Sequence, residues 1–239
     1  MTVEVHIPNK PFFSELPVRV KDDLPENSRI RVTEIFYSLQ GEGRYSGQPT
    51  VFIRLTGCPL RCVYCDSEYA FYGGQWLEFE DIFSLLSNYT TNYVCVTGGE
   101  PLAQPNCLFL LEELCKRDFN VSLETSGAMD ISDVDRLVSR ALDIKTPDSG
   151  EENKNLWSNL DELTEHDQIK FVICSKIDYE WAKDIVQSHG LDKKCLVLFS
   201  PSYQQLDARH LADWILQDQL PVRFQTQLHK LIWQDEAGR

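Results

Sequence analysis

Short apolar runs alternate with amphipathic stretches along most of the chain, and this alternation limits the possible folds more than any other feature. The apolar runs have the length and composition of buried strands: Val51–Leu55, Tyr93–Thr97, Val121–Thr125, Ala141–Lys145, Ile169–Ile173, Cys195–Phe199 and Pro221–Gln225. The stretches between them have the apolar spacing of helices: Leu77–Tyr89, Cys107–Arg117, Ile131–Arg140, Tyr179–His189 and Ala208–Gln217. This pattern predicts an α/β fold with a parallel sheet flanked by helices.

A barrel or partial barrel is the first expectation, because polar motifs directly follow several predicted strands, where barrels carry their chemistry. A doubly wound sheet is the alternative, which periodicity alone does not separate from a barrel. Residues 1–29 are rich in proline and charge and show no sustained period, so we expect an N-terminal extension before a core domain at 30–239. The polar segment Asp148–Asn159 is expected to form a loop over one end of the sheet.

The net charge of −14 excludes a global basic field for binding nucleic acid. The sequence shows neither an apolar run long enough to span a bilayer nor the pattern of a signal peptide, which predicts a cytoplasmic protein without a membrane partner. A long chain of this kind is expected to keep its cysteines reduced. Those scattered among apolar residues are expected to be small buried hydrophobes: Cys95, Cys107, Cys115, Cys174 and Cys195.

Three other cysteines, Cys58, Cys62 and Cys65, form the pattern C-x3-C-x2-C directly after the predicted strand Val51–Leu55. A structural zinc site would need a fourth Cys or His, typically in a second spaced pair, and no such pair occurs in the sequence. The pattern favours a [4Fe–4S] cluster held by three thiolates, with one iron open to a small molecule. A zinc-binding interaction module, completed by one of the scattered cysteines, is the non-enzymatic alternative.

This cysteine loop resembles that of the radical S-adenosylmethionine (SAM) superfamily, in which the open iron chelates SAM. The motif TGGEP, Thr97–Pro101, is similar to the superfamily's glycine-rich motif, and Glu100 could accept a hydrogen bond from the SAM ammonium group. The longer segment SLQGEGRYSGQPTVFIRLTGCPLRCVYCDS, Ser38–Ser67, closely resembles the 7-carboxy-7-deazaguanine synthase family. Further matches are LETSG (Leu123–Gly127) and FQTQLHKLIW (Phe224–Trp233).

The resemblance implies a partial barrel of the radical SAM type and a specific carbon–nitrogen lyase reaction of queuosine biosynthesis. In that family, 6-carboxy-5,6,7,8-tetrahydropterin becomes 7-carboxy-7-deazaguanine and ammonia, after a 5′-deoxyadenosyl radical takes a hydrogen atom from C6 and SAM is regenerated. The resemblance also implies Mg2+, a homodimer, and a flavodoxin or ferredoxin as electron donor. A glycyl-radical-enzyme activase or another radical SAM enzyme is the alternative within the superfamily.

Individual residues take roles from the same resemblance. Arg54 matches the arginine that grips the substrate carboxylate, for which a planar guanidinium is suited, and an ion pair with a neighbouring glutamate is its structural alternative. The other implied substrate contacts are Leu39, Gln40, Gly41, Glu42, Thr97 and, in the C-terminal segment, His229. The implied SAM contacts are Tyr64, Cys65, Asp66, Gly99, Glu124, Ser126 and Lys145.

Two further positions follow from the family comparison. Ser67 matches the hydroxyl residue, Ser or Thr in the family, that holds Mg2+ beside the substrate, and such an oxygen suits a hard cation. Many members have S-P-K where this chain has Asp143–Lys145, DIK, so Lys145 is predicted to contact SAM and Asp143 is not. The segment Ser200–Tyr203 matches another SAM-contacting segment only weakly.

Overall fold

The computed structural model describes residues 28–234, 236 and 238. Its strands are β1 Arg29–Leu39, β2 Pro49–Leu55, β3 Gln75–Glu78, β4 Tyr93–Gly98, β5 Asn120–Thr125, β6 Ser139–Asp143, β7 Gln168–Ile173, β8 Leu196–Pro201 and β9 Arg223–Phe224. Its α-helices are α1 Phe79–Leu86, α2 Cys107–Lys116, α3 Lys176–His189, α4 Ala208–Gln217 and α5 Leu228–Trp233. The predicted N-terminal extension lies outside the described residues, except for Ser28 and Arg29.

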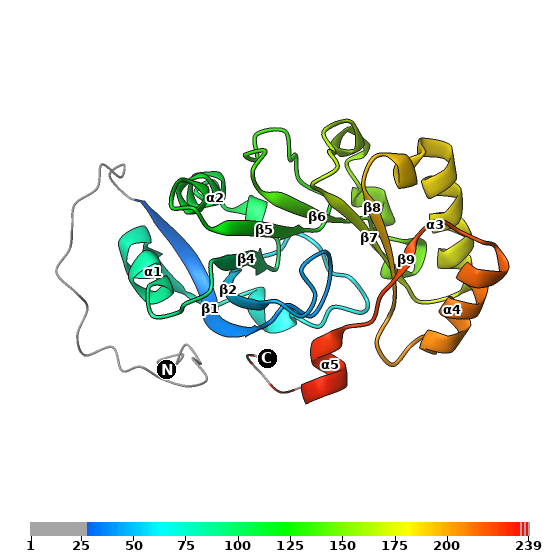
Figure 1. Ribbon diagram of the computed structural model, residues 1–239, viewed down its shortest axis with the longest axis horizontal. Coiled ribbons are helices and arrows are strands. Elements are labelled where there is room, and N and C mark those ends of the chain that lie inside the picture. The colour runs from blue at the N-terminus through cyan, green and yellow to red at the C-terminus, as the bar shows by residue number, and fades with distance from the viewer. Residues whose placement is uncertain (1–27, 235, 237, 239) are drawn as a thin grey trace.

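All strands belong to one sheet in the order β3-β1-β2-β4-β5-β6-β7-β8-β9. The strands from β2 and β4 to β9 are parallel to their neighbours, whereas β1 is antiparallel to both β2 and β3. Figure 1 shows the curved sheet with β1 toward one edge and β9 at the other, and with α2, α3 and α4 outside it. The parallel strands follow chain order without the reversal that defines a doubly wound sheet. The prediction of a partial barrel is therefore confirmed.

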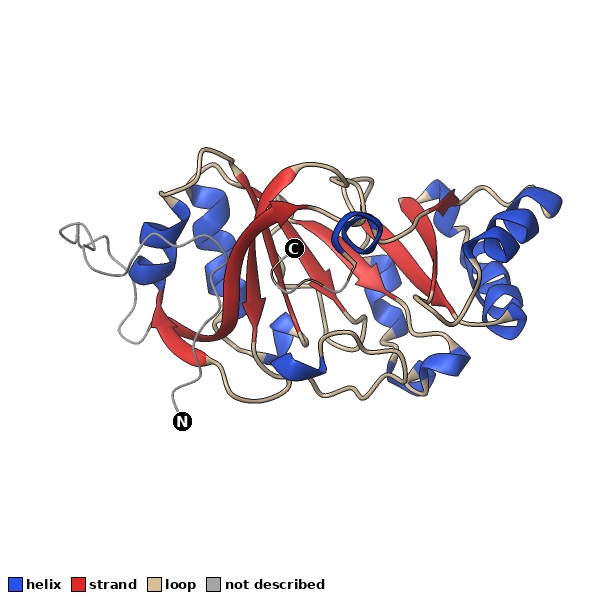
Figure 2. Cartoon of the chain, turned by 90° about the horizontal axis from the view of Figure 1, so that it is seen from below, coloured by secondary structure: helices blue, strands red, loops and turns tan. Residues whose placement is uncertain are grey.

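The two faces of the sheet differ because successive side chains of a strand point to opposite sides. On the outer face, side chains such as Ile53 of β2 pack against apolar residues of the helices, including Leu110 of α2 and Tyr179 of α3. On the inner face, adjacent strands each present one polar side chain to a common cavity: Arg54 of β2, Thr97 of β4, Glu124 of β5, Asp143 of β6 and Lys170 of β7. The sheet thus separates an apolar core from a polar interior. Figure 2 shows the strands of the sheet, in red, and the helices, in blue, from below.

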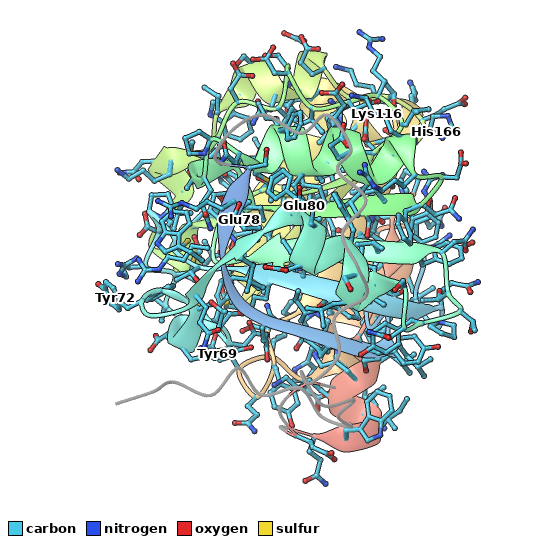
Figure 3. All side chains as sticks on the ribbon, turned by 90° about the vertical axis from the view of Figure 1, so that its left-hand side faces the viewer. Tyr69, Tyr72, Glu78, Glu80, Lys116 and His166 are labelled. Carbon is cyan, nitrogen blue, oxygen red and sulfur yellow. The ribbon has the colours of Figure 1, made fainter. Side chains whose placement is uncertain are left out.

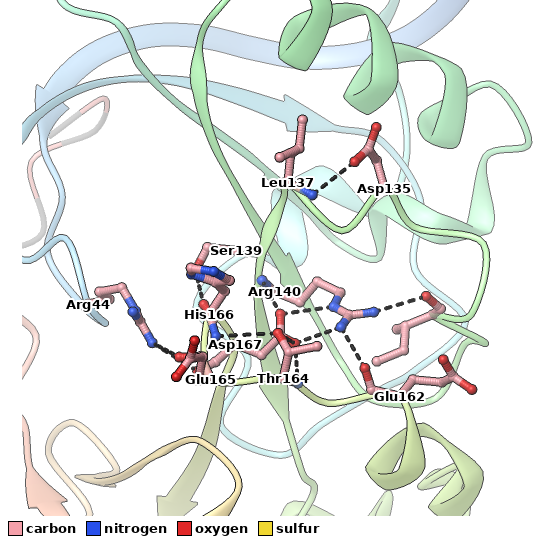
Figure 4. A network of polar contacts seen from close by, with 11 residues as sticks. Arg44, Asp135, Leu137, Ser139, Arg140, Glu162, Thr164, Glu165, His166 and Asp167 are labelled. Carbon is pink, nitrogen blue, oxygen red and sulfur yellow. Dashed lines mark hydrogen bonds and ion pairs between the residues drawn. The ribbon is translucent and has the colours of Figure 1, made fainter.

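The helix predicted at Ile131–Arg140 is wrong, because this stretch forms turns that lead into β6. Aspartate side chains accept hydrogen bonds from backbone amides two residues ahead, at Asp130 to Ser132 and at Asp135 to Leu137. Such local bonds compete with a helix. Arg140 is drawn into the interior by a buried ion pair with Asp167 at 2.6 Å, and Figure 4 shows this pair together with the Asp135 turn.

Other element boundaries also differ from the sequence expectations. The helix expected at Leu77–Tyr89 is shortened to α1, because β3 occupies its start and pairs with β1. The strand expected at Pro221–Gln225 is only the two residues of β9. The expected loop Asp148–Asn159 contains short 3-10 turns. No helix among residues 28–234 is both long and apolar enough to serve as a bilayer span.

The connection between β1 and β2, Gln40–Gln48, reaches the far side of the sheet. The backbone amide of Gly43 donates to Gln225 Oε1 at 2.6 Å, and that of Arg44 donates to Gln168 Oε1 at 2.7 Å. The Arg44 side chain also bonds to the carbonyl oxygen of Glu165 (Figure 4). We call this set of contacts the hairpin clasp, because it joins the first strands of the sheet to β7 and to the segment after β9.

Candidate functional site

A cavity of about 1020 Å³ lies on the inner face of the sheet. Except for Glu100, every residue that the sequence predicts to hold the cluster, SAM, Mg2+ or substrate lines this cavity. These residues come from the β1–β2 hairpin, the cysteine loop, the ends of the parallel strands and α5. The structure therefore brings the predicted residues together, while their individual roles remain predictions.

The cysteine loop is held by hydrogen bonds within the loop and by one to a neighbouring segment. The guanidinium of Arg61 donates to the carbonyl oxygens of Cys58 at 2.8 Å and Leu60 at 2.6 Å. The amide of Val63 donates to the carbonyl oxygen of Ser149 at 3.0 Å, which ties the loop to the segment after β6. The loop is thus fixed by contacts that do not use its thiols.

The three thiols of Cys58, Cys62 and Cys65 are free and half-buried at the cavity wall. Within the described residues, no three His, Cys, Asp or Glu side chains are grouped around a point where one metal ion would fit. A four-iron cluster does not require such a grouping, because each thiolate binds a different iron. Burial raises the pKa of Cys62 to about 11, against the opposing effect of Lys145. Metal binding at this thiol must therefore release a proton.

The glycine-rich motif has a structural role that the sequence did not predict. Glu100 is fully buried, and its carboxylate accepts hydrogen bonds from the backbone of Leu102 and Ser126 and from the hydroxyls of Thr125 and Ser126. The suggestion that Glu100 meets the SAM ammonium group is therefore wrong, because its oxygens are already used inside the protein. The same bonds occupy the hydroxyl of Ser126, a predicted SAM contact.

Gly99 is required for packing between the motif and the cysteine loop. A Cβ at this position would lie 2.3 Å from the carbonyl oxygen of Gly57 and 2.7 Å from Cβ of Cys58. The backbone that approaches Gly99 most closely thus belongs to the cysteine loop. Gly99 also lines the cavity, so it sets the position of the loop relative to the end of β4.

Arg54 forms an ion pair with a glutamate and also keeps an edge that can bind a carboxylate, which are the two predicted alternatives. Its Nε donates to Glu34 Oε1 at 2.7 Å, which is the ion pair with a neighbouring glutamate. Its Nη atoms donate no hydrogen bond to any described residue, and the side chain lines the cavity. Burial alone would lower the pKa of Arg54, but Tyr69 and Glu34 raise it, so the guanidinium stays charged. An open, charged edge therefore faces the cavity.

An ion-pair network forms another part of the cavity wall. Lys170 Nζ lies 2.8 Å from Glu42 Oε2 and 3.5 Å from Asp143 Oδ2, and Lys145 Nζ lies 3.1 Å from Asp143 Oδ1. Glu42 is therefore not a surface carboxylate, and Asp143 serves to hold the two lysines. Sequence reasoning missed Lys170, although a single charge within the apolar run IKFVI could have indicated a residue that faces away from the core.

Glu124 lies beside this network, and burial, with Glu42 and Asp143 nearby, raises its pKa to about 7 despite the opposing charge of Lys170. A carboxyl whose pKa is higher in the folded protein stabilises the fold below its unfolded pKa, and this stabilisation is lost as the pH rises through the folded pKa. We expect Glu124→Gln to leave stability unchanged near pH 4.5 and to raise the free energy of unfolding by about 1–3 kcal/mol at pH 8.

Urea unfolding of wild type and Glu124→Gln between pH 4.5 and 8 measures this difference. The exposed Glu165 provides the control, because Glu165→Gln should follow the wild-type curve at every pH. Parallel pH dependences for wild type and Glu124→Gln would show that Glu124 does not titrate as expected.

Tyr64 and Lys145 define the side of the cavity next to the cysteine loop. Lys145 Nζ lies 5.8 Å from the centre of the Tyr64 ring. The Tyr64 hydroxyl is buried without a hydrogen-bond partner among the described residues, and burial raises its pKa. A buried polar atom without a partner is costly, so this hydroxyl fits a ligand that brings polar groups to it. An aromatic face with a polar edge suits a nucleoside such as that of SAM.

Helix α5 brings the C-terminal segment to the mouth of the cavity. The amide of Leu228 donates to the carbonyl oxygen of Gly41 at 2.9 Å, and Gln227 Nε2 donates to Asp66 Oδ2 at 3.3 Å. The ring of His229 lies so close to Gly41 that a Cβ there would be 2.0 Å from His229 Nδ1. The helix thus connects the β1–β2 hairpin to the cysteine loop, and it places His229 beside the predicted substrate contacts.

Comparison of the sequence with known proteins finds similarity to the family that the cysteine loop resembles. The model of the radical SAM superfamily matches residues 52–149. A 7-carboxy-7-deazaguanine synthase from Koribacter versatilis is 42% identical over 87% of this chain and 99% of its own length. The enzyme of that name from Chlorobaculum tepidum is also 42% identical, over 87% of this chain and 96% of its own length.

The fold has a solved counterpart in the crystal structure of QueE from Escherichia coli. The two structures superpose with a TM-score of 0.70 at 24% identity, covering 84% of this chain and 95% of that one. At this sequence identity the superposition shows a shared fold only. The two relatives compared by sequence are 42% identical, and this chain matches nearly their whole length. The chain therefore belongs to the 7-carboxy-7-deazaguanine synthase family of the radical SAM superfamily.

Proposed function

We propose that this protein converts 6-carboxy-5,6,7,8-tetrahydropterin into 7-carboxy-7-deazaguanine and ammonia, as a step of queuosine biosynthesis. The observation that carries the proposal is that one cavity contains both the three-cysteine loop and the open edge of Arg54. The first suits a cluster that starts radical chemistry, and the second suits a carboxylate on the molecule to be transformed. Relatives bearing the name of this activity support it further.

In the proposed site, Cys58, Cys62 and Cys65 hold a [4Fe–4S] cluster. The cluster and SAM, when bound, supply the one-electron chemistry that starts the reaction. Tyr64 and Lys145 bind the nucleoside and carboxylate ends of SAM from the wall next to the loop. Asp66, Gly99, Glu124 and Ser126 complete this side, and the hydroxyl of Ser126 is held in place by its hydrogen bond to Glu100.

On the substrate side, Arg54 binds the carboxylate and thereby fixes which carbon of the pterin faces SAM. The side chain of Gln40 and the backbone groups of Leu39 and Gly41 form hydrogen bonds with the edge of the pterin ring. The Gln40 side chain is held by a bond from the Gly41 amide to its Oε1 at 3.0 Å. Thr97, Glu42 and His229 complete the contacts. Because α5 covers part of the mouth, it would also help to exclude water from the reacting atoms.

Ser67 is proposed to hold Mg2+ beside the substrate. Its hydroxyl donates to Asp66 Oδ1 at 2.7 Å, so two hard oxygen ligands lie next to each other at the cavity wall. Burial alone would raise the pKa of Asp66, but the bonds from Ser67 and the charges of Lys170 and Arg54 lower it, which keeps the carboxylate ionised.

We expect Ser67→Ala to weaken the stimulation of turnover by Mg2+, because it removes the hydroxyl oxygen from the cation's ligand shell. Initial rates measured over a range of Mg2+ concentrations test this. Ser67→Thr is the matched control and should keep the wild-type response, since it retains the hydroxyl. An identical Mg2+ dependence in Ser67→Ala and wild type would count against the assignment.

The proposed function is tested by anaerobic reconstitution with iron and sulfide, followed by incubation with SAM, Mg2+, dithionite and 6-carboxytetrahydropterin. Mass spectrometry should detect 7-carboxy-7-deazaguanine without stoichiometric loss of SAM. If SAM is cleaved without this product, the protein is another radical SAM enzyme, such as an activase. A colourless protein with bound zinc and no SAM cleavage would support the zinc-binding module instead.

The same proposal includes the partners and the organisation of the chain. A flavodoxin or ferredoxin would reduce the cluster in the cytoplasm, and two copies of the protein would form a homodimer. Residues 30–239 would form one radical SAM core domain with its C-terminal substrate-binding segment. Light scattering after gel filtration measures the oligomeric state directly.

A further inference from the structure

A β-bulge in β1 turns Glu34 toward the cavity. In the register between β1 and β2, Val32 pairs with Leu55 and Glu34 pairs with Arg54, so Thr33 is an extra residue on β1. Without this insertion, alternation from the buried core residue Val32 would also point Glu34 into the core. Bulges of this kind redirect side chains near active sites. Here the bulge places a buried glutamate directly opposite the arginine of the cavity.

Glu34 fixes one edge of the Arg54 guanidinium. Its Oε1 accepts from Arg54 Nε at 2.7 Å and from the hydroxyl of Tyr69 at 2.7 Å, while only 7% of Glu34 is exposed. The rings of Phe36 and Tyr69 each lie 5.7 Å from the carbon at the centre of the guanidinium. Tyr69 comes from the segment after the cysteine loop and lies on the side of the molecule shown in Figure 3.

We propose that Glu34 is a positioning residue, which holds Nε of Arg54 so that the Nη edge meets the substrate carboxylate end-on, with Tyr69 as the third member of the arrangement. This inference rests on the proposed function, because it assumes a carboxylated substrate. An arginine side chain is long and flexible, so fixing it in advance removes a cost that binding would otherwise carry. Glu34 also balances the charge of Arg54 before the substrate arrives.

The test compares two fluorescent ligands on the reconstituted protein: 6-carboxypterin, which has the carboxylate, and pterin, which lacks it. Wild type should bind 6-carboxypterin more tightly. Glu34→Ala should reduce this preference about 10-fold or more, which is the size expected for a misaligned charge-assisted contact. Glu34→Gln should keep the preference to within about threefold, because its amide oxygen still accepts from Nε. The affinity for pterin should be the same in all three proteins.

Tyr69→Phe provides a second variant that should fold even if Glu34→Ala does not, because it removes only a hydroxyl at a half-exposed position. It should lower the preference for 6-carboxypterin about twofold to fivefold, in line with the loss of one hydrogen bond. Tyr37→Phe, which removes the hydroxyl of an exposed tyrosine on β1, the strand of Glu34, is the matched control and should have no effect.

Full preference in Glu34→Ala, or an equal loss in Glu34→Gln and Glu34→Ala, would overturn the positioning role. The first result would show that Arg54 needs no support, and the second that only the charge of Glu34 matters. If wild type binds neither ligand or shows no preference for the carboxylate, the proposed substrate is wrong and this inference fails with it. The two failures are therefore distinguished by the wild-type measurement alone.

Discussion

Replacing Cys62 by alanine will leave the reconstituted protein without an intact iron–sulfur cluster and reduce turnover to the background of the assay. Cys62 contributes one of only three thiols in the loop, so its loss removes a ligand that no nearby side chain replaces among the described residues. Because the radical chemistry depends on the cluster, kcat should fall by at least about 10³-fold, well beyond the loss from a single binding contact.

Iron and sulfide content, together with the visible absorption of the reconstituted protein, measures cluster loss independently of turnover. Cys195→Ala is the matched control, because Cys195 is a half-buried thiol outside the cavity lining. It should keep the cluster and most of the activity. A Cys62→Ala protein with full iron content and turnover would show that the loop does not hold the cluster.

Arg54→Met should lower kcat/KM for the carboxylated substrate by about 10²- to 10⁴-fold, as expected for the loss of a bidentate charge-assisted contact worth about 3–5 kcal/mol. Part of this effect arises because the variant leaves Glu34 buried without its cation. Arg54→Lys should recover little of the loss, since an ammonium group cannot offer two parallel N–H bonds while it also holds Glu34.

Steady-state kinetics over a range of substrate concentrations test this, with SAM binding measured in parallel. SAM affinity should remain close to wild type, because the predicted SAM contacts lie on the loop and on other strands. Equal losses of SAM binding and substrate turnover in Arg54→Met would instead indicate a general collapse of the cavity. A wild-type kcat/KM in Arg54→Lys would show that charge alone, without planar geometry, is sufficient.

Much of the fold could be predicted because strand and helix periods are local properties of the sequence. The parallel strands and α2, α3 and α4 were all indicated by apolar spacing. The turns at Ile131–Arg140 were missed because aspartates there bond to the backbone nearby, which an apolar period does not reveal. Strand β3 was missed because β1 creates it by pairing, and its own residues include no buried side chain.

The sequence predicted which residues line the site, but it did not predict the contacts that hold these residues in place. The cysteine loop and Arg54 stand in recognisable motifs, so their residues could be named in advance. Glu34 and Lys170 stand in no such motif, and their importance depends on a bulge and on a register between strands. The commitment of Glu100 to Ser126 depends on the spacing of two strand ends, which no single segment encodes.

The hairpin clasp has a consequence for how the protein is made. The β1–β2 connection is among the first described segments to leave the ribosome. Two residues that form hydrogen bonds with it, Gln225 with Gly43 and Leu228 with Gly41, are among the last described ones. Until those residues are synthesised, the nascent chain can build most of the sheet but cannot close the substrate side of the cavity. Assembly of a binding-competent site is therefore delayed until Gln225 and Leu228 have been synthesised, and the thiols of the cysteine loop must remain reduced throughout that interval.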